Sequence, residues 1–227
     1  MIKFPRKLYF PQSNQSGLTI IECLVAVLVV SVLMAAIAPA IALSVATRVQ
    51  ARRVERATQA ARSYIDGLSA GTISAPSQTA SLPFATNATV PTGSSSWSCT
   101  TTATNLYCSN ITTSSLYCID LDVSSNGYTC TKDSVNDFIV QAFRTGNAQN
   151  YLLGIRVYRA DGFSDSSTFQ KSDGTSKKIA STYTSGLGNR KAPLIEMITE
   201  ISPERPKYTD FCNRLDSSAT APCKSNN

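Results

Sequence analysis

A run of apolar side chains at residues 23–46 constrains this chain most, because only Ser31, Pro39 and Ser44 interrupt it. A helix that spans a membrane needs about 20 apolar residues, whereas the core of a cleaved secretory signal has about 7–15. The run therefore predicts a transmembrane helix. Pro39 lacks an N–H donor and clashes with the preceding turn, so we expect a kink or local melting of that helix there.

The charges near this run are unevenly placed. The 227 residues carry a net charge of +6, and Lys3, Arg6 and Lys7 precede the run. Five arginines follow it directly: Arg48, Arg52, Arg53, Arg56 and Arg62. From Gly67 to the end there are 13 basic and 12 acidic residues without a basic stripe, so we expect no nucleic-acid partner. We interpret the arginines as a solvated helix face with some contact to lipid headgroups.

Seven cysteines bear on the compartment in which the domain folds. Cys23 falls in the apolar run, where a free thiol behaves as a small hydrophobic group. The other six lie beyond the run, at Cys99, Cys108, Cys118, Cys130, Cys212 and Cys223. An even set in a domain rich in Ser and Thr predicts up to three disulfides and an oxidising compartment. Among the many possible pairings we predict only Cys212–Cys223, which would close a short C-terminal loop.

The chain contains no histidine, and this excludes the commonest catalytic and metal sites. Ser–His–Asp triads, Cys–His pairs and histidine metal ligands all need that side chain. The sequence also lacks a pair of cysteines separated by two residues and the glycine-rich loops that hold nucleotide phosphates. We therefore expect no catalytic residue, no metal, no cofactor and no enzyme activity.

The helical pattern continues past the apolar run in amphipathic form. Its apolar positions recur at steps of three and four, at Val45, Val49, Ala57, Ala60, Ala61, Tyr64, Ile65 and Leu68. Gly67 is the expected C-terminal stop. The pattern predicts one helix of about 50 residues, with a transmembrane and assembly part at 18–46 and an amphipathic part at 47–68. A leader at 1–17 precedes the helix, and a globular domain at 69–227 follows it.

Strand signals follow a loop-rich segment of the domain in which Ser and Thr are frequent. Two candidate strands flank the Asn-Gly dipeptide at 126–127, which predicts a hairpin of residues 115–123 and 127–132. Two longer candidates predict a second hairpin of residues 137–144 and 151–159.

A further strand is expected at 193–201. The alternation of side chains in the 151–159 strand indicates a sheet with one wetter face. These patterns predict an α+β fold, in which the long N-terminal helix packs on a small antiparallel β-sheet of about four to six strands. We expect this domain to be stapled by disulfides.

A short motif joins the leader to the apolar run. The basic leader ends at Gly17, and Leu18, Thr19 and two isoleucines lead to Glu22. Together with the apolar run, this motif resembles the type IV prepilin family, which includes type IV pilins and the pseudopilins of type II secretion. The resemblance implies a pilin-like fold, cleavage between Gly17 and Leu18 by a membrane peptidase, and methylation of Leu18. Pro39 matches a frequent helix-breaking proline of the family, whereas Leu18 departs from the commoner phenylalanine.

The chemistry of these residues fits such a role. Gly17 has no side chain, so it can enter a cramped protease site. Glu22 lies about one helical turn beyond the new α-amine of Leu18, and a charge buried in a helix bundle is tolerable only when it is paired. The amine of a neighbouring subunit would neutralise Glu22 and set the axial register, and the resemblance gives Thr19 and Pro39 a part in assembly. The alternatives are an ordinary loop glycine and a carboxylate that reaches the membrane interface unpaired.

The resemblance implies a structural subunit, a minor pilin or pseudopilin. Its partners would be the prepilin peptidase and methyltransferase, other pilin subunits, an assembly platform in the inner membrane, and the membrane itself. The chain would cross the cytoplasmic membrane once with its domain in the periplasm, and would reach the cell surface or a filament after assembly.

Two interpretations of other classes stand beside this one. The first is a tip-located minor pilin that acts as an adhesin or binds glycans or DNA. Trp97 is a candidate for stacking on a sugar, although a lone tryptophan beside a cysteine is more often packed. The second is a membrane-anchored enzyme, against which the lack of a visible catalytic set counts.

Three segments of the domain suggest a narrower assignment. Residues 137–144, 151–163 and 186–201 resemble pseudopilins of hormogonium polysaccharide secretion in filamentous cyanobacteria. This second resemblance implies a filament that supports gliding motility and polysaccharide export.

Overall fold

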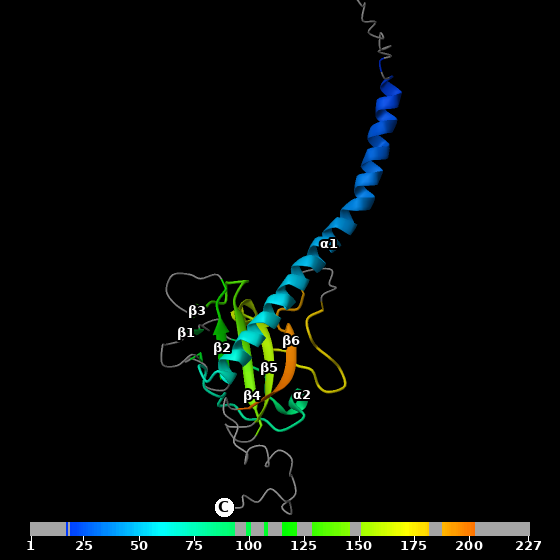
Figure 1. Ribbon diagram of the computed structural model, residues 1–227. Coiled ribbons are helices and arrows are strands. Elements are labelled where there is room, and N and C mark those ends of the chain that lie inside the picture. Colours follow the sequence, from blue (N-terminus) through cyan, green and yellow to red (C-terminus); the bar gives the residue numbers. More distant parts are fainter. Residues whose placement is uncertain are drawn as a thin grey trace, which may run out of the picture. The chain divides into compact units, whose positions relative to one another are not determined.

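Figure 1 shows the computed structural model of the chain. The structure describes residues 17, 19–93, 99–100, 107–108, 115–121, 129–145, 151–181 and 188–202. The chain divides into two compact units, Met1–Ser44 and Val45–Asn227, and each is described by itself. One helix, α1 (Ile20–Ser69), begins in the first unit and ends in the second.

Helix α1 has 50 residues, as the sequence pattern predicts. It remains helical through Pro39, so the local melting expected there is absent, and the expected kink stays a prediction. The helix ends at Ser69 rather than at Gly67. Gly71 takes a positive φ of 72°, a conformation that costs glycine little. Gly67 instead accepts hydrogen bonds on its carbonyl from the backbone N–H groups of Thr72 and Ile73, at 3.0 and 3.1 Å.

The second unit contains a four-stranded antiparallel sheet. Its strands, in spatial order, are β2 (Ser115–Ile119), β4 (Phe138–Arg144), β5 (Tyr151–Arg159) and β6 (Ile195–Ile201). A separate antiparallel pair consists of β1 (Cys99–Thr100) and β3 (Thr129–Cys130), and two short helices are α2 (Phe84–Asn87) and the 3₁₀ helix η1 (Ala160–Ser164).

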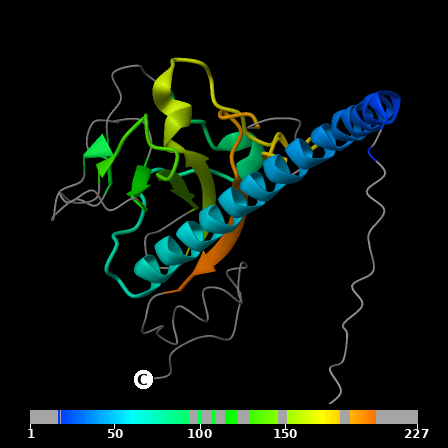
Figure 2. The same cartoon turned by 90° about the horizontal axis from the view of Figure 1, so that it is seen from above.

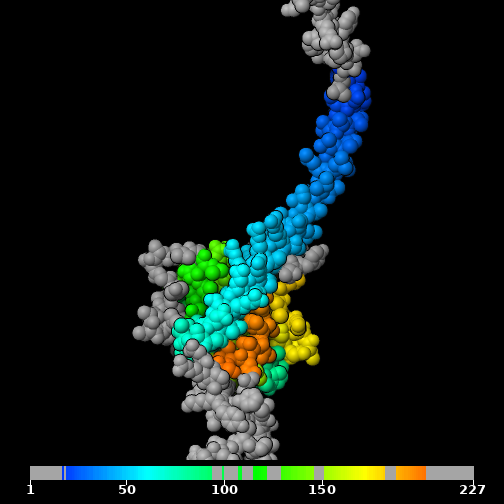
Figure 3. Space-filling view, in the orientation of Figure 1, coloured from blue at the N-terminus to red at the C-terminus, as the bar shows by residue number. Residues whose placement is uncertain are grey.

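The C-terminal half of α1 covers one face of the large sheet (Figures 1 and 2). The space-filling view shows this half lying against β6, drawn in orange (Figure 3). Ala57 and Ala61 are completely buried in the resulting core, and such small side chains let a helix approach a sheet closely. The predicted α+β fold, a long N-terminal helix on a small antiparallel sheet, is confirmed.

Tyr64 is the largest side chain that α1 buries in this core. Its hydroxyl lies 2.6 Å from that of Tyr107, and the Tyr107 hydroxyl donates to the carbonyl of Ser74 at 2.8 Å. Tyr64 is therefore the donor to Tyr107, and the chain of bonds gives both hydroxyls a partner within the protein. Burial raises the pKa of Tyr64 well above its usual value, and the neighbouring Tyr107 raises it further.

One of the two predicted hairpins is wrong and the other is confirmed. Strand β2 pairs with β4 and strand β3 pairs with β1, so β2 and β3 do not form the hairpin expected around residues 126–127. That dipeptide lies outside the described residues. Strands β4 and β5 pair as expected, with Phe138 opposite Arg159 and Arg144 opposite Leu153.

The prediction of one wetter sheet face is also wrong. Arg156 and Tyr158 of β5 are 2% and 0% exposed, although they alternate with the residues that face α1. The reason is that α2, η1 and the segments around them cover the second face, where Phe84 packs on Phe143 and Phe169 packs on Tyr158. Sheet residues on both faces thus belong to cores.

In the described part of the chain, two disulfides belong to the core on this second face of the sheet. Cys99 is bonded to Cys108, and Cys118 of β2 is bonded to Cys130 of β3. The second bond joins the two strands that share no hydrogen-bonded ladder. Cys212 and Cys223, the one pair predicted from the sequence, lie outside the described residues. Cys23 is a free, exposed cysteine.

Candidate functional site

The first candidate site is the start of α1, where Gly17 precedes the helix. A side chain added at Gly17 would meet no described atom within 4 Å, and Gly17 is exposed. The described fold therefore gives no reason for a glycine at this position. A requirement for glycine there would come from a partner that handles this segment.

Thr19 and Glu22 form the N-terminal cap of the helix. The Thr19 carbonyl accepts the backbone N–H groups of Glu22 and Cys23, at 3.0 and 3.1 Å, and the Thr19 hydroxyl lies 3.4 Å from the N–H of Glu22. A threonine followed three residues later by glutamate has the spacing of a capping box. The carboxylate of Glu22 is exposed in the first turn, where the helix dipole favours a negative charge.

The helix surface that follows is apolar and uncovered within its own unit. Its large side chains from Ile20 to Ile41 are about half exposed or more, from 49% at Val30 to 84% at Ile20. The hydroxyl of Ser31 donates to the carbonyl of Val27 at 2.7 Å, so this polar group is satisfied inside the helix. By length and composition α1 is able to cross a membrane.

The arginines beyond the apolar run are mainly exposed, which agrees with their interpretation as a solvated helix face. Arg48, Arg52, Arg56 and Arg62 are exposed, whereas Arg53 is half-buried. The Arg56 guanidinium donates to the side-chain oxygen of Asn136 at 3.2 Å. This contact ties the helix to the segment that leads into β4.

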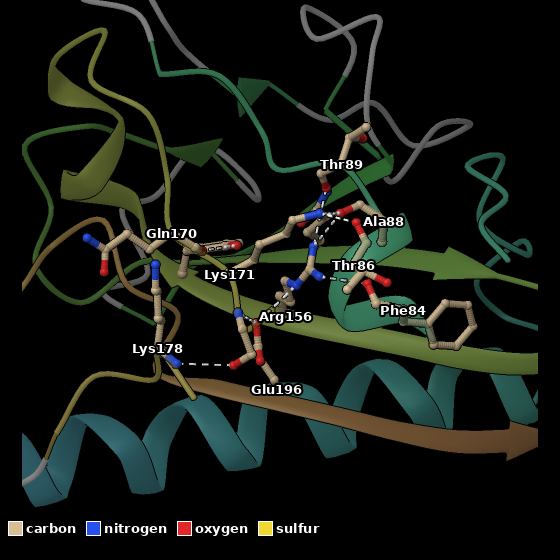
Figure 4. A network of polar contacts seen from close by, with 12 residues as sticks. Phe84, Thr86, Ala88, Thr89, Arg156, Gln170, Lys171, Lys178 and Glu196 are labelled. Atoms are coloured by element: carbon tan, nitrogen blue, oxygen red, sulfur yellow. Dashed lines mark hydrogen bonds and ion pairs between the residues drawn. The ribbon is translucent and has the colours of Figure 1, made fainter. Parts of the chain in front are cut away.

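A polar network inside the second unit was not predicted from the sequence. Arg156, at the middle of β5, donates from Nε to Glu196 on the neighbouring strand at 3.1 Å. Its Nη1 donates to the carbonyls of Ala88 and Thr89, both at 3.3 Å, and its Nη2 donates to that of Phe84 at 3.0 Å (Figure 4). The guanidinium thus fixes α2 and the residues after it to the second face of the sheet.

Lys171 reinforces the same arrangement. Its ammonium donates to the carbonyl of Ala88 at 2.8 Å and to that of Thr86 (Figure 4). Burial lowers the pKa of Lys171, the charge of Arg156 lowers it further, and Glu196 opposes this. Gln141 of β4 also donates to the Thr89 carbonyl at 2.7 Å. These contacts satisfy the carbonyls of the buried Phe84 and Ala88 and tie down the exposed Thr86 and Thr89 beside them, so we assign the network to the stability of the domain.

A groove of about 510 Å³ opens beside this network. Phe84, Phe143, Met197 and Ile198 give it an apolar lining, and Arg156 and Glu196 add charged groups, together with the loop at 172–179. Pockets of about 300–1,000 Å³ are of the size that small ligands occupy. Trp97, the residue considered for sugar stacking, lies outside the described part of the chain.

Comparison with known proteins finds one similarity, at the start of the chain. Residues 12–38 match the prokaryotic N-terminal methylation motif, which is consistent with the type IV prepilin and pseudopilin family. The match includes Gly17, Thr19 and Glu22 and the first part of α1. Neither the curated proteins nor the solved structures gave a match.

Proposed function

We propose that this chain is the precursor of a minor pilin or pseudopilin, cleaved between Gly17 and Leu18 and methylated on Leu18. The methylation motif and the fold support a type IV pilin-like precursor. The observation that carries the proposal is the combination of this motif with an exposed apolar helix whose C-terminal half packs on an antiparallel sheet. We propose that the chain is a structural subunit and not an enzyme, because the methylation motif is typical of proteins with a structural role.

The exposed apolar surface of α1 would serve two successive roles. In the membrane it contacts lipid, and in a filament it contacts the helices of neighbouring subunits, both of which bury apolar side chains away from water. We propose that the domain lies in the periplasm, where the disulfides Cys99–Cys108 and Cys118–Cys130 are stable. The prepilin peptidase and methyltransferase, other pilins and an inner-membrane assembly platform would be the partners.

Glu22 would pair with the methylated amine of a neighbouring Leu18. Its carboxylate is exposed on a surface that is otherwise apolar, so assembly of the helices would remove it from water. An unpaired charge in such a bundle is costly, whereas a paired one is tolerated, and subunits would therefore stop in the register that pairs them. Thr19 would cap the helix at the start of the mature chain, and Pro39 would take part in assembly by bending the helix.

The role of the assembled filament is a finer proposal. The segments at 137–144, 151–163 and 186–201 support a function in polysaccharide export and gliding motility, by their resemblance to hormogonium pseudopilins. A tip-located adhesin that binds a glycan is the second candidate, and the groove of about 510 Å³ beside β6 favours it. Binding of the full-length protein to a glycan array would support the second candidate.

Replacing Glu22 by Ala tests the charge pairing. The variant should be cleaved normally, because the change lies beyond the cleavage site, and its incorporation into filaments should fall at least about tenfold. Sheared filaments and membranes would be compared by immunoblot against a Glu55→Ala control, which removes an exposed carboxylate from the other half of α1. Incorporation equal to that of the control would contradict the pairing of Glu22.

A further inference from the structure

A second, smaller groove lies where α1 meets the start of β4. It has a volume of about 270 Å³ and is lined by Val49, Arg52, Arg53, Arg56, Val135, Asn136 and Phe138. We call it the arginine groove. Among the described residues, all the ionisable groups that line it are arginines, so the groove favours a negatively charged ligand.

The fold brings these arginines to one groove and fixes Arg56 there. Arg52 and Arg56 are four residues apart on α1 and therefore lie on the same side of the helix. The guanidinium of Arg56 donates to Asn136, which comes from a different part of the sequence. Val135 and Phe138 supply an apolar wall beside them. The site thus exists only when the helix is packed on the sheet.

Arg53 of the arginine groove is influenced by charges from outside the groove. Burial lowers the pKa of Arg53, the positive charge of Arg159 lowers it further, and Asp161 opposes this. Asp161 is itself in an ion pair with Arg159. Glu55 lies on the same stretch of helix but does not line the groove. A bound anion would offset the repulsion that Arg53 experiences from Arg159.

The position of the groove along α1 indicates where that anion comes from. The apolar run ends at Ala46, and at a rise of about 1.5 Å per residue Arg52 and Arg56 lie about 9 and 15 Å further along the axis. Helical side chains lean toward the N-terminus of their helix, which here is the direction of the apolar run. A bilayer carries a headgroup layer of about 5–8 Å on each side of its hydrocarbon core. Arginine side chains are long, and those that lean back along the helix from beyond this layer extend toward its phosphates.

Membrane topology does not explain these arginines. In the proposed orientation they follow the transmembrane segment on its periplasmic side, whereas Lys and Arg are normally enriched on the cytoplasmic side. Only Lys3, Arg6 and Lys7 stand before the segment, against five arginines directly after it. The topology rule therefore does not account for the arginines on the periplasmic side of the membrane, whereas binding of an anionic ligand does.

We propose that the arginine groove binds the phosphate of an anionic phospholipid headgroup. Guanidinium groups bind phosphate through two parallel hydrogen bonds, and Arg52, Arg53 and Arg56 offer such donors on one groove. The inference rests on the proposed membrane anchor and on no step of cleavage or filament assembly. According to this proposal, one defined groove binds the headgroup, rather than the whole arginine-bearing face of the helix.

Diffuse attraction to headgroups along the helix and specific binding in the arginine groove predict opposite orders for the loss of lipid affinity in two variants of the full-length protein. Diffuse attraction weakens with distance from the membrane, so Arg48→Gln would then cost more affinity than Arg56→Gln. The groove predicts the reverse, because Arg56 lines it and Arg48 does not. We expect phosphatidylglycerol binding to weaken about fivefold in Arg56→Gln and to change less than about twofold in Arg48→Gln.

The measurement is native mass spectrometry of the full-length protein in detergent, titrated with phosphatidylglycerol or phosphatidylcholine. Asn136→Asp places a carboxylate in the groove from outside the helix and should weaken phosphatidylglycerol binding, whereas Arg56→Lys keeps the charge and should weaken it less than Arg56→Gln. Near-ultraviolet circular dichroism would establish that each variant keeps the native fold.

Three outcomes would overturn the proposal. The first is a larger effect of Arg48→Gln than of Arg56→Gln, or equal binding of the two lipids. The second is displacement of the lipid by inorganic phosphate at the same concentration, which would make free phosphate the ligand. The third is unchanged lipid binding in Arg56→Gln together with reduced filament incorporation, which would assign the groove to a carboxylate of a partner subunit. The first two outcomes do not depend on cleavage before Leu18 or on its methylation, so they separate this proposal from the proposed function.

Discussion

Arg156 shows how much of the domain can depend on one side chain. It is 2% exposed, and it contacts a carboxylate on β6 and three backbone carbonyls of the segment that contains α2. Its guanidinium also lies over the ring of Phe143, with Cζ 4.9 Å from the ring centroid. The same side chain therefore links β5 to β6 and fixes α2 and the residues after it to the second face of the sheet.

Replacing Arg156 by Met should lower the free energy of unfolding by about 3 kcal/mol, because it leaves the partly buried Glu196 unpaired and three carbonyls short of a donor. Chemical unfolding of the full-length protein in detergent measures this. The control is Arg190→Met, an exposed arginine whose replacement should change stability by less than about 0.5 kcal/mol. Equal stability of the two variants would contradict the assigned role of Arg156.

At the scale of elements, α1 is fixed to the sheet by its small residues. Ala61 is 0% exposed in the core, whereas Ala51 is exposed on the same helix. Ala61→Leu should lower the free energy of unfolding by about 1–3 kcal/mol, because a well-packed core has no room for the added atoms. Ala51→Leu makes the same change in helix propensity and should be nearly neutral. The prediction fails if the two leucine variants unfold at the same denaturant concentration.

The elements differ in how far their sequence predicts them. The repeat of apolar residues at helical spacing gives the length of α1 and the buried positions Ala57, Ala60 and Tyr64, because a single helix is a local structure. It also names Val45 and Val49, which are exposed. The partner of a strand is decided by the rest of the domain. Strand β2 pairs with the buried β4 and is joined to β3 by Cys118–Cys130, so the dipeptide at 126–127 misleads.

At the scale of the whole molecule, the two parts of the chain differ in the range of their interactions. The N-terminal motif is made of adjacent residues, whereas the domain depends on contacts between residues far apart in the sequence. The motif runs from Gly17 to Glu22, and residues 12–38 match the prokaryotic N-terminal methylation motif. The Arg156 network and the arginine groove join residues far apart in sequence, such as Arg56 and Asn136. Local patterns of charge and apolar residues cannot pair them, which is why the sequence did not predict these sites.

The buried tyrosines of the domain should make its stability depend on pH in the alkaline range. Burial raises the pKa of Tyr64, Tyr107 and Tyr158, although the hydrogen bond with Tyr64 opposes this at Tyr107 and the charge of Arg156 opposes it at Tyr158. The unfolded chain, with tyrosine pKa values of about 10, then releases these protons at lower pH than the folded one. The stability that these groups contribute is complete below pH about 10 and is lost as the pH rises further.

Unfolding of the full-length protein in detergent between pH about 8 and about 11 measures this loss. The variant Tyr64→Phe should start less stable, because it lacks the bond to Tyr107, but its stability should fall less steeply with pH. An equal slope in the two proteins would show that Tyr64 does not contribute to the alkaline transition.

The central claim is that the chain is a precursor processed at the junction of its leader and α1. Mass spectrometry of the N-terminal peptide from the protein in its native membrane tests this most directly. We predict a peptide that begins with a methylated Leu18, and an intact leader in a Gly17→Trp variant, which the described fold tolerates because no described atom lies within 4 Å of a side chain at Gly17. A native N-terminus at Met1, or normal cleavage of the Gly17→Trp variant, would contradict the account.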